Sequence, residues 1–247
     1  ESDGNKLFGV KKLKVFEENV ASANGKLLSI GEFLEFSGLG GTDWIDKNAD
    51  QYIKKGESFL NEPYPLLEAH DYMRFYREGN RSIFQEFYSK RRTLLFTFFL
   101  AELAEKKGRF TDRVADGVWH ILEETTWVIP AHINRATPLI PEYGEKLKLI
   151  DLFSAGTAAM LAVVYLLGRD LLDGVTPIIR ERILYELNRR IIKPFIEVDS
   201  MWWMGSDGKR ALNNWTPWIC SNVLTVCALC VEDNDIRRKT AERAMLF

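Results

Sequence analysis

Apolar residues recur at intervals of three and four positions along most of this 247-residue chain, the spacing that places them on one face of an α-helix. The segment 44–60, for example, shows this spacing at Ile45, Ala49, Tyr52 and Ile53. No stretch of useful length alternates apolar and polar residues, as a half-buried strand would. The pattern predicts an all-α protein, with helices over 44–60, 82–107, 112–124, 152–168, 176–194, 215–231 and 235–247.

Residues typical of helix starts and helix ends delimit several of these segments. Ser82 followed by Gln85 is a capping-box pattern, in which two side chains satisfy backbone N–H groups at the helix start. Thr176 followed by Pro177 is typical of another start. Pro194 is expected to end the helix that starts at Thr176, because proline lacks a backbone N–H group and clashes with the preceding turn.

The helices number about eight, or four hairpins, and such hairpins must stack into a bundle, a solenoid or a closed toroid to bury their inner faces. No repeat of fixed period is visible, which disfavours a regular solenoid. The prediction is one domain over 1–247, with the weakest helical signals in 1–42. The last helix reaches Phe247 without a cap or polar tail, so we expect the chain to be part of a longer protein.

The charge balance excludes some classes of partner. With 33 basic and 35 acidic residues the net charge is -2, so a general binder of nucleic-acid backbones is not expected. The uncharged run 152–168 is slightly short of the ~20 residues that a membrane span needs. Its small residues suit close packing, so we interpret it as a buried inner helix.

The three cysteines, Cys220, Cys227 and Cys230, fall in one apolar segment at helical spacing. They are interpreted as buried free thiols. The three histidines lie far from them in the sequence, and no strong zinc-binding pattern is present. We therefore predict neither a metal nor another cofactor.

The segment 201–222 concentrates residues that bind sugars. Indole rings stack on the apolar faces of sugar rings, and side-chain amides bond hydroxyl and carboxylate groups without adding charge. Each residue alone has a plainer role, since Trp202 and Trp215 would serve as core anchors and either asparagine as a helix cap. The cluster as a whole favours a glycan site, formed by Trp202, Trp203, Asn213, Asn214, Trp215 and Trp218.

A second candidate segment, 119–134, contains two histidines. His120 and Glu124 are four positions apart on a predicted helix, so they are expected to pair as ordinary surface or core partners. His132 lies in a loop with Trp127 and Pro130, where it is better placed to act as an acid, a base or a ligand. A metal site from His120, Glu124 and His132 is the minority alternative.

These motifs resemble the N-terminal domain of the heparinase II/III-like polysaccharide lyases. The resemblance runs from about Tyr72 to Phe247. It rests on the order and spacing of Trp127-Val-Ile-Pro130-Ala-His132, Asp151-Leu-Phe before a small-residue helix, Trp202-Trp203, and Asn213-Asn214-Trp215. The family implies an incomplete (α/α) toroid followed by a β-sandwich domain, and a secreted or periplasmic location.

The resemblance also implies a chemistry. In such lyases an amide neutralises the uronate carboxylate, a tyrosine or histidine removes the proton from C5, and a tyrosine protonates the leaving oxygen. By this resemblance Asn213 or Asn214 is the neutralising amide, His132 lies close by, and the substrate-binding residues are Trp127, Trp202, Trp203, Trp215 and Trp218. Related lyases can have histidine where Trp215 follows Asn214. The proton-abstracting residue is expected beyond Phe247, so this chain alone is expected to be inactive.

Two other functions stay open at this stage. A glycan-binding or scaffold module would use the same tryptophan and asparagine groove to hold an acidic polysaccharide without cleaving it. A glycoside hydrolase would need two carboxylates about 5 to 9.5 Å apart across a bond. Glu123, Glu124 and Asp207 are the available carboxylates.

Overall fold

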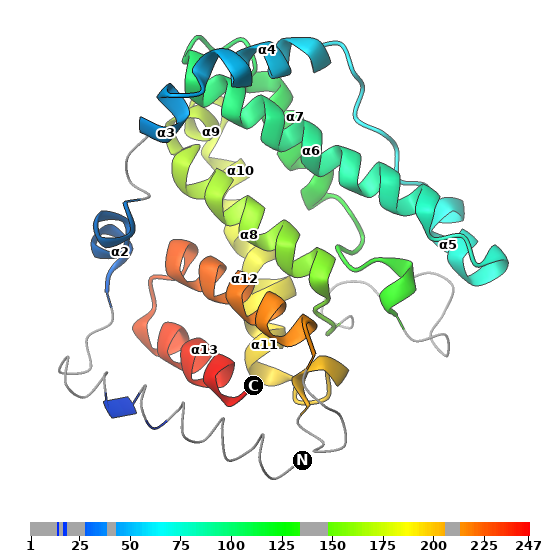
Figure 1. Ribbon diagram of the computed structural model, residues 1–247, viewed down its shortest axis with the longest axis vertical. Coiled ribbons are helices and arrows are strands. Elements are labelled where there is room, and N and C mark those ends of the chain that lie inside the picture. Colours follow the sequence, from blue (N-terminus) through cyan, green and yellow to red (C-terminus); the bar gives the residue numbers. More distant parts are fainter. Residues whose placement is uncertain (1–13, 15–16, 19–27, 39–42, 134–147, 206–212) are drawn as a thin grey trace. The chain divides into compact units, whose positions relative to one another are not determined.

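The computed structural model describes residues 14, 17–18, 28–38, 43–133, 148–205 and 213–247. All regular elements within these ranges are helical, which confirms the predicted all-α class (Figure 1). The chain divides into two compact units. Unit 1 comprises 1–40, 148–159 and 187–247, and unit 2 comprises 41–147 and 160–186.

In unit 1 the helix α12 (Trp215–Cys230) packs against α13 (Asn234–Leu246) and against α2 (Ile30–Ser37). A short loop joins α12 to α13, and the two lie side by side as a hairpin (Figure 1). The unit also contains the π-helical turn η3 (Asn188–Ile192), α11 (Lys193–Glu197) and the 3-10 turn η4 (Trp202–Met204). Buried residues from these elements, including Ile191, Phe195 and Val223, form its core.

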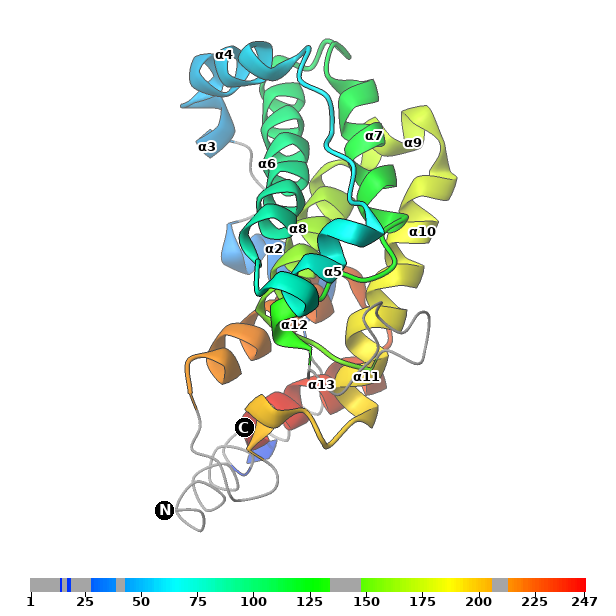
Figure 2. The ribbon, with the colours of Figure 1, turned by 90° about the vertical axis from the view of Figure 1, so that its right-hand side faces the viewer.

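Unit 2 is organised around α6 (Ser82–Glu105), the longest of the described helices. It packs against α4 (Ala49–Phe59) and α7 (Thr111–Leu122), and less extensively against α3 (Asp43–Asp46) and α5 (Ala69–Glu78) (Figure 2). Its fully buried aromatic residues, among them Phe98 and Phe99, explain why this helix is central. The unit also contains η1 (Pro130–His132), α9 (Arg169–Val175) and nearly all of α10 (Pro177–Leu187).

The helix α8 (Leu152–Leu167) starts in unit 1 at a reciprocal cap. The Ser154 N–H donates to Asp151 Oδ1 at 2.7 Å, and the Asp151 N–H donates to Ser154 Oγ at 2.9 Å. No single described helix has both the length and the apolar character to cross a membrane. α8 and α9 meet that test only as a pair, and the chain bends by 83° between them.

One predicted helix cap and two predicted helix boundaries were wrong. The start of α6 is capped by Asn80, whose Oδ1 accepts from the Ser82 and Ile83 N–H groups, so Ser82 and Gln85 form no capping box. The segment 44–60 is two helices, α3 and α4. Pro194 does not end its helix: the wider π-helical turn η3 precedes it and places it in the first turn of α11, where its missing N–H is not needed.

Candidate functional site

The tryptophan pair that begins η4 has one member in the core of unit 1. Trp203 is 1% exposed, its indole N–H donates to the Ile150 carbonyl at 2.7 Å, and its ring stacks on Phe195. The Thr216 hydroxyl donates to the Trp203 carbonyl at 2.6 Å. Trp203 therefore fixes the start of α12 against η4, and its predicted contact with a sugar stays a prediction.

The other tryptophans of this segment reach the surface of unit 1. Trp202 and Trp215 are both half-buried, with ring centroids 4.6 Å apart and planes inclined by 56°. Trp218, three positions further along α12, is 59% exposed. Exposed indole surface of this kind offers the apolar face on which a sugar ring stacks.

The two asparagines before α12 have different roles. The Oδ1 atom of Asn213 accepts from the Trp215 N–H at 2.8 Å, so this side chain satisfies a donor at the helix start. Asn214 is exposed, and within the described part of the chain its amide makes no hydrogen bond. Asn214 is therefore the residue whose amide is available to a ligand.

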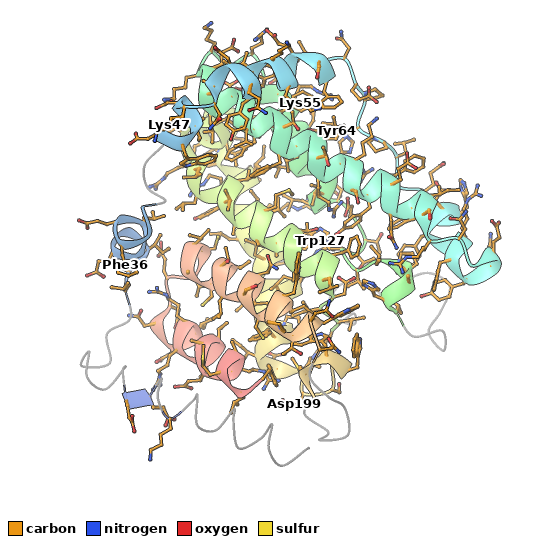
Figure 3. All side chains as sticks on the ribbon, viewed as in Figure 1. Phe36, Lys47, Lys55, Tyr64, Trp127 and Asp199 are labelled. Carbon is orange, nitrogen blue, oxygen red and sulfur yellow. The ribbon has the colours of Figure 1, made fainter. Side chains whose placement is uncertain are left out.

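Unit 2 holds the other two predicted site residues. Trp127 is 1% exposed, its indole N–H donates to the Ile121 carbonyl at 2.9 Å, and its own carbonyl accepts from the Tyr88 hydroxyl (Figure 3). It is a core residue whose predicted contact with sugar remains a prediction. His132 is half-buried at the end of η1. The structure thus groups Trp202, Trp203, Asn213, Asn214, Trp215 and Trp218 in unit 1, and places Trp127 and His132 in unit 2.

Glu124 has stronger partners than the predicted His120. It accepts from Arg91 Nη1 at 3.2 Å and from Arg92 Nη1 and Nη2 at 2.9 and 2.6 Å. The His120 ring instead lies against Tyr64, with centroids 5.3 Å apart. Burial, and then the positive charge of Arg91, hold the pKa of His120 below its ordinary value. Sequence reasoning missed the two arginines as partners of this carboxylate.

The carboxylates considered for a hydrolase have structural roles in unit 2. Glu123 forms an ion pair with Arg182 of α10, and Glu124 forms ion pairs with Arg91 and Arg92. Asp207 lies outside the described residues. Neither described carboxylate is placed as a free acid or base.

A different group of possible metal ligands occurs at the start of α5. One atom each of Glu68, His70 and Asp71 lie within 4.8 Å of one another. Arg74 Nε sits 3.0 Å from the Asp71 carboxylate, and the N-terminal end of a helix carries partial positive charge. Both features oppose a cation, so this group is interpreted as a local set of ion pairs around the buried Asp71.

No family model matches this sequence, and no curated protein is significantly similar to it. The strongest arrangement is the start of α12, where the exposed Asn214 directly precedes Trp215, whose half-buried ring contacts that of Trp202. It offers neutral hydrogen-bond donors and apolar surface, which suit a polyhydroxylated ligand that carries a carboxylate.

Proposed function

We propose that this chain is the helical, incompletely closed (α/α) toroid of a secreted or periplasmic polysaccharide lyase, which cleaves uronate-containing polysaccharides by β-elimination. The observation that carries the proposal is the exposed amide of Asn214, which makes no hydrogen bond to the described residues and directly precedes Trp215, whose ring contacts that of Trp202. The resemblance of the tryptophan, histidine and asparagine motifs to the heparinase II/III-like lyases supports it.

The chemical problem in β-elimination is the acidity of the uronate C5–H bond. Removal of this proton puts negative charge next to a carboxylate, and donors already positioned at that carboxylate lower the barrier. A base takes the C5 proton, the electron pair forms a double bond between C4 and C5, and the C4–O bond breaks. The departing oxygen then takes a proton.

Asn214 suits the neutralising role for two reasons. Its amide nitrogen donates hydrogen bonds but carries no charge that would bind the carboxylate equally well in the ground state. It also precedes a helix of 16 residues, whose N-terminal end carries partial positive charge that favours an anion. His132 is the proposed participant in proton transfer, and a β-sandwich domain of the same protein would supply the remaining groups.

The arrangement of helices supports the toroid in part. The α6 and α7 pair and the α12 and α13 pair are each joined by a short connection and packed together. Helix hairpins of this type are the repeating unit of an (α/α) toroid. Trp202, Trp215 and Trp218 would then line the cleft in which the polysaccharide binds.

The test uses the natural full-length protein, incubated with a panel of uronate polysaccharides while the ultraviolet absorbance of the unsaturated product is followed. We expect absorbance to rise with at least one polymer and the Asn214→Ala variant to lose at least about a hundredfold in rate, the scale for removal of one oxyanion donor. Asn213→Ala is the matched control, because it removes a neighbouring amide that is engaged by the backbone. Circular dichroism verifies that both variants are folded.

Two results would overturn the proposal. Binding of a polysaccharide with no unsaturated product from any polymer would make the protein a glycan-binding module. Equal rates for the wild type and a folded Asn214→Ala variant would remove Asn214 from the chemistry.

A further inference from the structure

Unit 2 contains a pocket whose lining includes none of the residues of the proposed lyase site. Its volume is about 310 Å³, and its walls come from the chain around the start of α5, from α6, and from the end of α7 with the residues that follow. Ligand pockets in proteins are roughly 300 to 1,000 Å³. The volume therefore suits one small molecule, about the size of a single sugar, rather than a polymer.

A buried arginine, Arg91, lines the pocket. The Arg91 side chain is 8% exposed, its Nε donates to the Pro65 carbonyl at 2.8 Å, and its Nη1 donates to the His120 carbonyl at 3.3 Å and to Glu124 at 3.2 Å. Its Nη2 has no hydrogen-bond partner among the described residues and is not sealed from solvent. The guanidinium group is thus held rigidly with two N–H groups left for a ligand.

Arg91 is the one positively charged residue among those that line the pocket, which also include Glu68, Glu123 and Glu124. Arg91 and Arg92 share the single carboxylate of Glu124, and all three side chains are nearly buried. Burial, and then the positive charge of Arg91, lower the pKa of His120, which favours the neutral ring beside the guanidinium group. A ligand carboxylate that reaches the Nη2 group of Arg91 would accept charge-assisted hydrogen bonds there.

His120 adds both kinds of hydrogen-bonding group to the same wall. Its ring nitrogens make no hydrogen bond to the described residues and are open to solvent. A neutral imidazole offers one donor and one acceptor. Beside Arg91, this pair of groups fits a carboxylate oxygen and an adjacent hydroxyl.

The rim of the pocket selects against more highly charged ligands. Glu68 and Glu123 line it, with side chains 56% and 49% exposed, and Glu123 is already paired with Arg182. Carboxylates at this position accept hydrogen bonds from hydroxyl groups and repel a second negative charge. Thr125, also on the wall and exposed, offers a further hydroxyl.

We propose that this pocket is a binding site for a small polyhydroxylated monocarboxylate, a sugar acid such as a free hexuronate. Arg91 and His120 bind the carboxylate end, and Glu68, Glu123 and Thr125 bind the hydroxyl groups. The site does not rest on the proposed lyase activity, because it uses none of the residues at the start of α12. Each proposal can fail without the other.

The first experiment is isothermal titration calorimetry of the chain with sodium D-glucuronate as the probe. D-glucose, which lacks the carboxylate, and D-glucose 6-phosphate, which carries a dianion near neutral pH, are the comparison ligands. We expect one glucuronate per chain, bound at least about tenfold more tightly than either comparison ligand, as one charge-assisted hydrogen bond provides. No binding of glucuronate to the folded chain, or equal binding of glucose, would overturn the proposal.

Variants locate the site. Arg91→Lys keeps the charge but removes the unengaged Nη2 group, and we expect at least about tenfold weaker binding of glucuronate. Arg92→Lys is the matched control: it alters the other arginine on Glu124, which does not line the pocket, and should change binding by less than about threefold. Equal losses in the two folded variants would contradict the assignment.

Thr125→Trp keeps the test decisive if Arg91→Lys does not fold. Thr125 is exposed on the pocket wall, so a bulky ring there fills the space without disturbing Arg91. We expect this variant to remain folded by circular dichroism and to lose detectable binding of glucuronate. Unchanged binding in Thr125→Trp would exclude the pocket as the site.

Discussion

The two proposed ligand sites, at the start of α12 in unit 1 and in the pocket of unit 2, use opposite kinds of polar group. At α12 the polar group is an exposed, neutral amide beside half-exposed indole rings. In the pocket it is a buried guanidinium group that forms an ion pair with Glu124. Exposed neutral groups can be changed with little effect on folding. Buried charges tie the ligand site to the stability of the unit around it.

The sharpest test of this contrast is Glu124→Gln. The substitution leaves two arginine side chains, 8% and 11% exposed, without their shared negative charge. Loss of one partner of a buried ion pair lowers the free energy of unfolding by about 3 to 5 kcal/mol, and we expect a loss in this range in urea denaturation. Glu123→Gln is the matched control. Its ion pair with Arg182 is much more exposed, so about 0 to 1 kcal/mol is expected. Similar losses in both variants would contradict the contrast.

The sequence predicts the two regions unequally, because its signals are local. Asn213, Asn214 and Trp215 are adjacent, so the motif and its cap are visible without a structure. Arg91 and Glu124 are 33 positions apart. The local signal for their contact is a pair of arginines shortly before the largely apolar run 94–101 of α6. The pocket therefore depends on how α6 and α7 pack, which periodicity does not specify.

The positions of most helices were predictable because their signals are local too. The residues at which the helices end were harder to predict. Apolar spacing located α6, α7, α8, α10, α12 and α13, since one buried face repeats through each. It missed α2, although Ser29 and Glu32 form a capping box there, and it missed α5. Competing capping residues such as Asn80 and Ser82 are two positions apart, so only the backbone conformation decides which one acts.

The two asparagines provide a smaller test within unit 1. Asn213→Ala removes the acceptor for the Trp215 N–H, and we expect a loss of about 1 kcal/mol in the free energy of unfolding, as for other helix caps. Asn214→Ala removes an exposed side chain without a partner among the described residues, so a change within about 0.5 kcal/mol is expected. Chemical denaturation measures both. The reverse order would mean that Asn214 is the cap and Asn213 the available amide.

The smallest expected effect is the pH response of His120 in the pocket. Burial, and then Arg91, lower the pKa of its ring in the folded state, while the unfolded chain has the usual value of about 6.5. Between these two pKa values the unfolded state binds more protons, so this histidine makes the protein less stable as the pH falls below about 6.5. An NMR titration of the ring protons should give a midpoint below 6.5. Saturation with glucuronate should raise that midpoint, because a carboxylate beside the ring favours the protonated form. A midpoint that is not lowered in the free protein would show that the pocket is more open and less positive than its geometry indicates.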